Sequence, residues 1–210
     1  MKLYHFSDNH GNIDWLSTVD FSEIDLIVST GDFFPNCSRV NAEKEVTFQR
    51  AWFQRNKDFL FEKFAGKTIL IVNGNHDFIC LAEELYSAGY YDAIKITTEG
   101  ETIDGITFAG FGEIPYITGQ WNREVDWREL KDLVEETLWC VPDVLITHAP
   151  PASILDAGLG IEPLLTALTY DRHKVKHHLF GHCHEFGGQR CERMEIKFYN
   201  SATTAQVIEI

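Results

Sequence analysis

The sequence lacks paired cysteines, long apolar runs and an excess of positive charge. Its five cysteines are scattered and form no C-x-x-C pair, so we expect neither a disulfide framework nor a structural zinc site. No apolar run approaches the roughly 20 residues that a membrane-spanning helix needs. The formal net charge of -14 argues against broad non-specific binding to nucleic acid or to an anionic membrane surface.

The first residues pass directly into a predicted strand, without the basic, apolar and small-residue regions of a signal peptide. Together with the unpaired cysteines, this start predicts a cytoplasmic protein that does not associate with membranes. At 210 residues the chain is long enough to bury a full core. Because no linker, repeat or low-complexity tract interrupts it, we expect a single domain over residues 1–210.

Short apolar runs alternate with amphipathic stretches through most of the sequence. Strands are expected at residues 3–6, 25–29, 68–72, 143–147 and 177–180, and helices at residues 42–64, 79–88, 125–138 and 162–170. This alternation predicts an α/β fold with at least one mostly parallel sheet. The aromatic residues of the helix at 42–64 are interpreted as core packing. Residues 195–199 and 205–210 are expected to form a closing hairpin.

Polar clusters follow five of these strands, at the point where each strand ends. The clusters are Ser7-Asp8-Asn9-His10, Gly31-Asp32, Gly74-Asn75-His76-Asp77, Thr147-His148 and Gly181-His182-Cys183-His184. In open α/β sheets, ligands bind at the carboxyl ends of the strands. A single Asp or His at a strand end is more often a turn former or a hydrogen-bonded core group, but the joint occurrence of five clusters favours a functional site.

The side chains in these clusters are typical metal ligands. Carboxylate, amide and imidazole groups are offered by Asp8, Asp32, Asn75, His10, His148, His182 and His184. Such mixed oxygen and nitrogen sets suit borderline divalent transition ions. Seven ligands exceed the need of one ion and fit two ions bridged by a carboxylate, an arrangement that clamps both oxygens of an in-line displacement at phosphorus.

A proton donor for the leaving group is also expected. His76 is a suitable general acid, and Asp77 is expected to hold its imidazole. Cys183 lies between two candidate ligands, but neighbouring side chains in such a loop point apart, so we interpret it as a small filler. The loops at residues 33–40 and 110–122 are expected to shape specificity.

Taken together, these motifs resemble the complete five-part signature of the calcineurin-like metallophosphoesterase superfamily. The resemblance runs from Asp8-x-His10 to Gly181-His182-x-His184 and so covers nearly the whole chain. The segments around His148 and His182 further resemble the small phosphodiesterase-type members. The resemblance implies two β-sheets packed face to face and flanked by helices, the four-layer αββα metallophosphoesterase fold.

The resemblance also implies a role for each matching residue. Asp8, His10 and His184 would bind the first ion, Asn75, His148 and His182 would bind the second, and Asp32 would bridge both. A bridging hydroxide would be the nucleophile, and His76 would protonate the leaving oxygen. The implied cofactors are two divalent transition-metal ions; manganese is expected, with iron, nickel and zinc as the alternatives.

The sequence departs from the protein Ser/Thr phosphatases of the superfamily. Gly31-Asp32 continues with Phe33-Phe34-Pro35-Asn36 rather than Asp-Arg-Gly, and Asp77 stands where those phosphatases have Glu. We therefore expect hydrolysis of a small phosphodiester, such as a cyclic nucleotide or a similar compound. A phosphomonoesterase or a nuclease on the same metal pair is the alternative, with nucleic acid disfavoured by the charge. A non-catalytic scaffold on this fold would not need His76 or the full ligand set.

Overall fold

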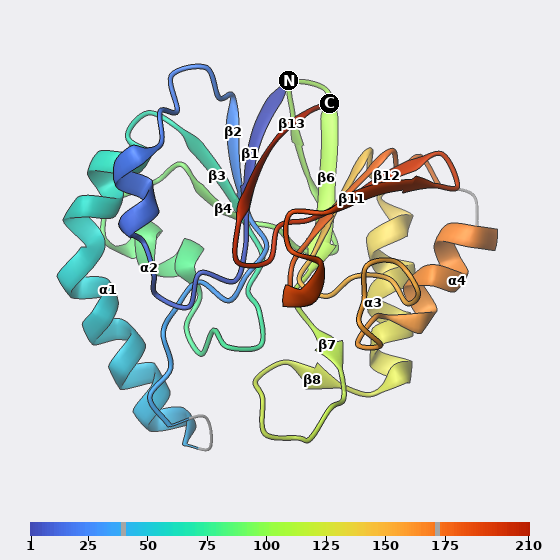
Figure 1. The fold of residues 1–210 in the computed structure, drawn as a ribbon, viewed down its shortest axis with the longest axis horizontal. Helices are drawn as coiled ribbons and strands as arrows, with labels where there is room; N and C mark the ends of the chain where they lie inside the picture. The colour runs from blue at the N-terminus through green and yellow to red at the C-terminus, as the bar shows by residue number, and fades with distance from the viewer. Residues whose placement is uncertain (39–40, 171–172) are drawn as a thin grey trace.

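The computed structural model describes residues 1–38, 41–170 and 173–210. Within these residues, two mixed β-sheets pack face to face, and helices cover the outer face of each sheet (Figure 1). The protein is thus the four-layer αββα sandwich that the sequence predicts. Arg39 and Val40, part of the loop expected to shape specificity, lie outside the described residues.

The first sheet is built mainly from the amino-terminal half of the chain. Its strand order is β13-β1-β2-β3-β4, with β13 antiparallel to β1 and the other neighbours parallel. The strands are β1 (Lys2–Phe6), β2 (Leu26–Ser29), β3 (Thr68–Ile71), β4 (Ala93–Lys95) and β13 (Ala205–Glu209). Its outer face is covered by the 3₁₀-helix η1 (Asp14–Thr18), α1 (Ala42–Phe64) and α2 (Leu81–Ser87).

The second sheet has the strand order β11-β12-β10-β9-β6-β5, with antiparallel pairs only at its two edges. The strands are β5 (Glu101–Ile103), β6 (Ile106–Phe111), β9 (Val144–Thr147), β10 (His177–Phe180), β11 (Arg190–Arg193) and β12 (Ile196–Asn200). Helices α3 (Trp127–Trp139) and α4 (Glu162–Tyr170) cover its outer face. A short ribbon of β7 (Ile114–Pro115) and β8 (Glu124–Val125) frames the loop at residues 116–123.

The strand sequences explain why both faces of each sheet are covered. All four residues of β2 are buried: Ile27 packs toward α1, whereas Leu26 and Val28 pack between the two sheets. On α1, Phe53 and Phe64 are buried in the outer core, and Trp52 and Phe59 pack against it. The aromatic residues of this helix therefore serve core packing, as expected. None of the described helices combines the length and the apolar character needed to cross a membrane.

One expectation about topology is wrong. Residues 196–200 and 205–209 form strands, but they do not pair as a closing hairpin. β12 pairs with β11 in the second sheet, and β13 crosses to the first sheet, where Phe6 pairs with Ala205 and Lys2 with Glu209. The apolar pattern of a segment identifies a strand and its buried face but does not specify its partner.

Candidate metal centre

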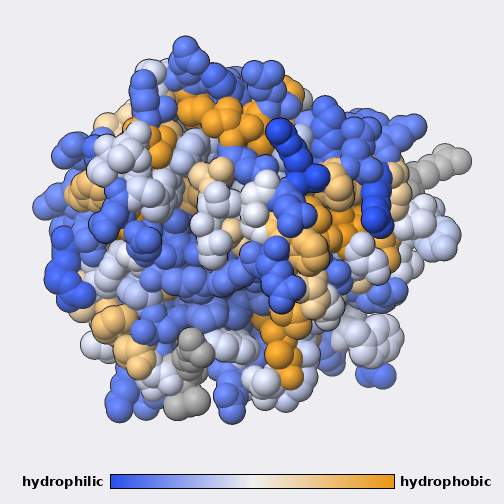
Figure 2. Space-filling view, viewed as in Figure 1, coloured by the Kyte–Doolittle hydropathy of each residue, from blue (hydrophilic) through white to orange (hydrophobic). Residues whose placement is uncertain are grey.

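The five predicted clusters meet at one place in the fold. The loops after β1, β2 and β3 reach it from the first sheet, and the loops after β9 and β10 reach it from the second. Figure 2 shows a band of hydrophilic residues across the middle of the face that is turned to the viewer. In the same view of the ribbon (Figure 1), the loop after β1 and the short 3₁₀-helix η2 (His184–Phe186) lie at this band. The clusters are thus brought together at the carboxyl ends of parallel strands, as the sequence predicts.

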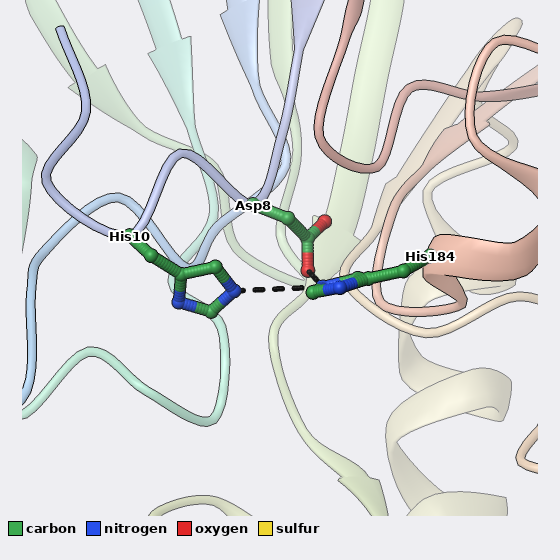
Figure 3. A group of neighbouring side chains, drawn as sticks. All are labelled: Asp8, His10 and His184. Carbon is green, nitrogen blue, oxygen red and sulfur yellow. Dashed lines mark hydrogen bonds and ion pairs between the residues drawn. The ribbon is translucent and has the colours of Figure 1, made fainter.

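Asp8, His10 and His184 form the first group of candidate ligands (Figure 3). His184 Nε2 lies 3.0 Å from Asp8 Oδ1 and 3.5 Å from His10 Nε2. One ligand atom of each residue lies within 4.8 Å of the other two. His10 and His184 approach from opposite sides with their ring nitrogens directed toward each other, which is the geometry of side chains around a shared cation (Figure 3).

Asp8, Asp32 and His148 form a second group, in which one ligand atom of each residue also lies within 4.8 Å of the other two. His148 Nε2 lies 3.4 Å from Asp32 Oδ2 and 3.0 Å from Asn75 Oδ1. On its other side, the Nδ1 of His148 donates to the carbonyl oxygen of Thr30 at 2.7 Å. This contact leaves Nε2, the nitrogen that faces Asp32 and Asn75, free of a proton in the neutral ring and so able to bind a metal.

His182 supplies the test of whether these residues fit a metal. Its backbone N–H donates to Asp8 Oδ2 at 2.9 Å, and its ring lies 5.0 Å from that of His148. Its Nε2 is buried without a hydrogen-bond partner among the described residues. A buried polar atom without a partner is costly, and an ion bound beside Asp32 and His148 would satisfy it. The donor set therefore fits a divalent transition ion.

The backbone is strained where it presents several of these side chains. Asp8, His10, Asp32 and His182 all have positive φ, between 47° and 64°, a region that non-glycine residues seldom adopt. Two glycines allow the strand ends to approach closely. A Cβ on Gly74 would lie 2.2 Å from Asp32 Oδ1, and one on Gly181 would lie 2.2 Å from Asp8 Oδ2. Gly74 and Gly181 are thus required because any larger residue would collide with a candidate ligand.

Burial and charge shift the proton affinities of the clustered groups in opposite directions. Burial alone would lower the pKa of His148, but the charge of Asp32 and its hydrogen bond raise this pKa to about 9. Burial opposes ionisation of Asp32, yet the positive charge of His148 holds the Asp32 pKa well below its usual range. Burial and the charge of His148 lower the pKa of His182 to about 4. The site keeps its carboxylates ionised, and a bound cation would substitute for the proton on His148.

The predicted acid, His76, lies at the edge of this cluster. Its backbone N–H donates to Asp32 Oδ1 at 2.7 Å, and its Nε2 lies 3.9 Å from Asp32 Oδ2. The expected contact with Asp77 is not the one found, since Asn36 Oδ1 lies 2.5 Å from the Nδ1 of His76. The Asp77 carboxylate instead accepts the backbone N–H groups of Gly74 and Phe34, at 2.9 and 3.0 Å.

Asp77 therefore shapes the loop around His76 rather than orienting its ring. Burial and the charge of Asp32 raise the pKa of Asp77 to about 7. No sequence signal pointed to Asn36, because its contact with His76 spans 40 residues. None pointed to Gln49 of α1 either, whose amide donates to the carbonyl oxygen of His76 at 2.7 Å and accepts the N–H of Phe78 at 2.8 Å.

A cleft of about 720 Å³ opens beside His76. We call it the acid-side cleft; it is lined by His10, Pro35, Asn36, Cys37, Ser38, His76, Trp121 and His184. The ring centroids of Trp121 and His76 are 4.3 Å apart. The loop that carries Trp121 is organised by Glu124, which accepts four backbone N–H groups from residues 117–121. Both loops expected to shape specificity thus contribute to this cleft.

The αββα fold and the clustered aspartates and histidines define a metallophosphoesterase. The calcineurin-like phosphoesterase family model matches residues 1–186. The chain therefore belongs to this family, whose members are typically hydrolases with two metal ions.

Solved structures share the fold at low sequence identity. One crystal structure matches with a TM-score of 0.66 and 14% identity, covering 96% of this chain and 90% of the other. The protein TT1561 of Thermus thermophilus gives 0.63 and 14%, with 96% and 88% covered. The Thermus thermophilus sulfate thiohydrolase SoxB in complex with glycerol gives 0.51 and 13%, with 96% and 51% covered. No match was found among curated protein sequences.

Proposed function

We propose that this protein hydrolyses a small phosphodiester with the help of two divalent transition ions. The observation that carries the proposal is the overlap of the ligand groups. Asp8 belongs to both groups described above, and a third set, His10, Asp32 and His76, shares His10 with the first group and Asp32 with the second. Overlapping groups suit two neighbouring ions better than one isolated ion. When bound, such ions activate water and stabilise negative charge on the phosphoryl oxygens.

Each candidate ligand has a role in this proposal. Asp8, His10 and His184 would hold the first ion, Asn75, His148 and His182 would hold the second, and Asp32 would contribute to both. The short contacts within each set support the assignment: His184 to Asp8 at 3.0 Å and His148 to Asn75 at 3.0 Å. A mixed imidazole and carboxylate set is compatible with manganese, which we propose as the native ion, and with iron, nickel or zinc.

His76 donates the proton that the leaving oxygen needs. The amide oxygen of Asn36 can only accept, so the Nδ1 of His76 carries a proton in this contact. Its Nε2 then faces Asp32 and the acid-side cleft, where it can transfer a second proton to a leaving group. Asn36 fixes the direction of the ring, and Gln49 and Asp77 fix the loop that carries it.

The choice of a diester over a monoester rests on the segments around His148 and His182, which resemble those of the small phosphodiesterase-type members. The same two ions would balance the charge of either ester, so the charge of the site does not decide between them. A phosphomonoester on the same metal pair remains the competing substrate class.

The test is metal-dependent hydrolysis of matched substrates. The protein is stripped with a chelator and reloaded with manganese, nickel, zinc or magnesium, and 4-nitrophenyl phosphate is compared with bis-4-nitrophenyl phosphate. Restored activity that favours the diester is the expected result. A monoester preference would overturn the diester assignment, and a folded protein that binds no transition ion would overturn the metal assignment.

A further inference from the structure

A second cleft also borders the first ligand group. We call it the η1 cleft; its volume is about 590 Å³, and it is lined by Tyr4, Asp8, Asn9, His10, Asn12, Trp15, Thr18, Val19, Thr203, Thr204 and Ala205. Both clefts fall in the volume range of small-molecule sites. The η1 cleft contains none of the residues 35–38, 76 and 121 that line the acid-side cleft.

The two clefts meet at the candidate metal centre. His10 lines both of them, while Asp8 lines only the η1 cleft and His76 only the acid-side cleft. A phosphorus atom held at the first ligand group would therefore border both clefts. A leaving group that takes its proton from His76 must occupy the acid-side cleft. Any second substituent on phosphorus would then have the η1 cleft available.

One wall of the η1 cleft is aromatic and well held. The rings of Trp15 and Tyr4 are stacked, with centroids 5.9 Å apart and planes 15° apart. Trp15 Nε1 donates to the carbonyl oxygen of Asn12 at 3.0 Å, which fixes the indole. The opposite wall is the turn before β13, where the backbone N–H of Thr203 donates to the carbonyl oxygen of Ser7 at 3.1 Å. Walls held in this way form a site before any ligand arrives.

The remaining lining residues that the structure describes are uncharged. Apart from the candidate ligands Asp8 and His10, the described residues around this cleft carry amides, hydroxyls, aromatic rings or aliphatic groups. Amides and hydroxyls form hydrogen bonds with hydroxyl groups and ring nitrogens, and an aromatic wall favours a flat or apolar ring face. A second phosphate or another charged group would find no opposite charge there.

We propose that the η1 cleft binds the non-leaving substituent of the phosphodiester, and that this substituent is an uncharged, ring-containing group of the nucleoside type. The inference rests on the proposed function and deepens it, because it assigns one substituent to each cleft. A phosphomonoester has no second substituent to place there. The substrate is then a diester of a single phosphate with two uncharged arms.

The experiment varies only the non-leaving arm. Methyl 4-nitrophenyl phosphate and thymidine 5′-(4-nitrophenyl phosphate) share one leaving group and differ in whether a nucleoside is present. The manganese-loaded protein is compared with Thr204→Trp and Thr18→Trp, which fill the cleft from opposite walls at exposed positions. Thr102→Trp, at an exposed position on β5 in the other sheet, is the matched control. Thermal unfolding verifies that each variant is folded.

We expect each cleft-filling variant to lower kcat/KM for the thymidine ester by about tenfold or more and to leave the methyl ester within about twofold. The control should change neither value. Calorimetry gives a readout without turnover: thymidine 5′-monophosphate should bind the cleft variants more weakly, while inorganic phosphate binds as before. An equal change for both esters, or no change for thymidine compounds, would overturn the subsite. Failure of the unmodified protein to hydrolyse either ester would instead contradict the proposed function, and the calorimetric comparison would still decide the subsite.

Discussion

The two sheets contribute differently to the candidate metal centre. The first sheet supplies both carboxylates and the amide, together with His10 and His76, whereas the second supplies only imidazoles. The formal negative charge of the ligand set therefore comes from one sheet. The second sheet supplies groups that are neutral as ligands, and one of them, His148, is oriented by a carbonyl oxygen of the first sheet at 2.7 Å.

This difference separates two requirements of a metal site. Charge balances the ions and decides affinity, while neutral donors complete the coordination geometry. A sheet that provides only histidines depends on the other sheet for both charge and orientation. We therefore expect changes in the first sheet to cost more than matched changes in the second.

The largest expected effect tests this asymmetry directly. Asp32→Asn should lower hydrolysis by several orders of magnitude and reduce the bound metal, because it removes the charge of the carboxylate proposed to bridge both ions. His182→Ala should cost less, since it removes one neutral donor. Metal content by mass spectrometry and kcat/KM measure both, with Asp132→Asn on α3 as an exposed control. Equal losses of bound metal and of kcat/KM in Asp32→Asn and His182→Ala would contradict the expected difference between the two sheets.

A second change separates proton transfer from metal binding within the first sheet. His76→Ala should retain both ions but lower kcat by about two to four orders of magnitude on substrates with poor leaving groups. The loss should be much smaller with 4-nitrophenolate, which leaves without a proton. Asn36→Ala should show the same dependence on the leaving group with a smaller loss. The same loss on good and poor leaving groups would rule out the acid role.

A third pair of variants tests one glycine from each sheet, at positions where the glycine backbone lies close to a side chain next to or within the ligand set. Gly74→Ala places a Cβ 2.2 Å from Asp32 Oδ1, and Gly181→Ala places one 2.0 Å from Ser7 Oγ. Each should weaken metal affinity by about 10- to 100-fold, because a displaced carboxylate no longer orients its ion. Gly89→Ala, where a Cβ meets nothing within 4 Å, should lower stability slightly and leave metal binding unchanged. Unaltered metal affinity in both Gly74→Ala and Gly181→Ala would show that the loops adjust.

The last expected effect is on stability rather than on activity, and it concerns one buried histidine in each sheet. Burial lowers the pKa of His5 on β1 and of His178 on β10 to about 3, from 6.5. The unfolded chain takes up these protons near pH 6.5 and the folded protein does not. The free energy of unfolding should therefore fall as pH decreases from about 6.5 toward 3, by about 1.4 kcal/mol per pH unit for each histidine.

Replacing these histidines by leucine should flatten the pH dependence but differ in cost near pH 7. His5 contacts the hydroxyls of Thr30 and Ser201 at 3.0 and 2.8 Å, so His5→Leu removes a partner from two buried hydroxyl groups. His178 contacts only one hydroxyl, that of Thr147 at 2.8 Å, and its Nδ1 has no partner among the described residues, so His178→Leu should cost less. Urea unfolding of chelator-treated protein between pH 4 and 8 measures both. If the free energy of unfolding kept the same dependence on pH in either variant, the replaced histidine would not be the group with the lowered pKa.

The sequence predicted the fold and the clustering of the candidate ligands because both depend on local patterns. Apolar runs mark the strands, and polar groups at the ends of parallel strands necessarily meet at one edge. Helices α1 and α4 begin and end where the sequence predicts. The expected helix at 125–138 begins instead at Trp127, because Asp126 caps it by accepting the N–H groups of Arg128 and Glu129.

What the sequence could not predict depends on contacts between distant segments. β12 and β13 have similar strand patterns, and only the packed structure shows that they belong to different sheets. Asp77 was expected to orient His76 because it is the next residue, but backbone N–H groups occupy its oxygens. Asn36 takes that place from a loop 40 residues away, and no spacing rule identifies such a pair.

The pairing of β1 with β13 has a consequence for the order in which the protein assembles. Leu3 pairs with Ile208, so synthesis must pass residue 208 before the first sheet gains this edge strand. The same holds for the metal centre, where Asp8 is translated early and its partner His184 late. A nascent chain on the ribosome would display both carboxylates, Asn75 and His10 before the three imidazoles of the second sheet. High-affinity metal loading should therefore require synthesis through His184, and translation products that stop before it should bind metal poorly.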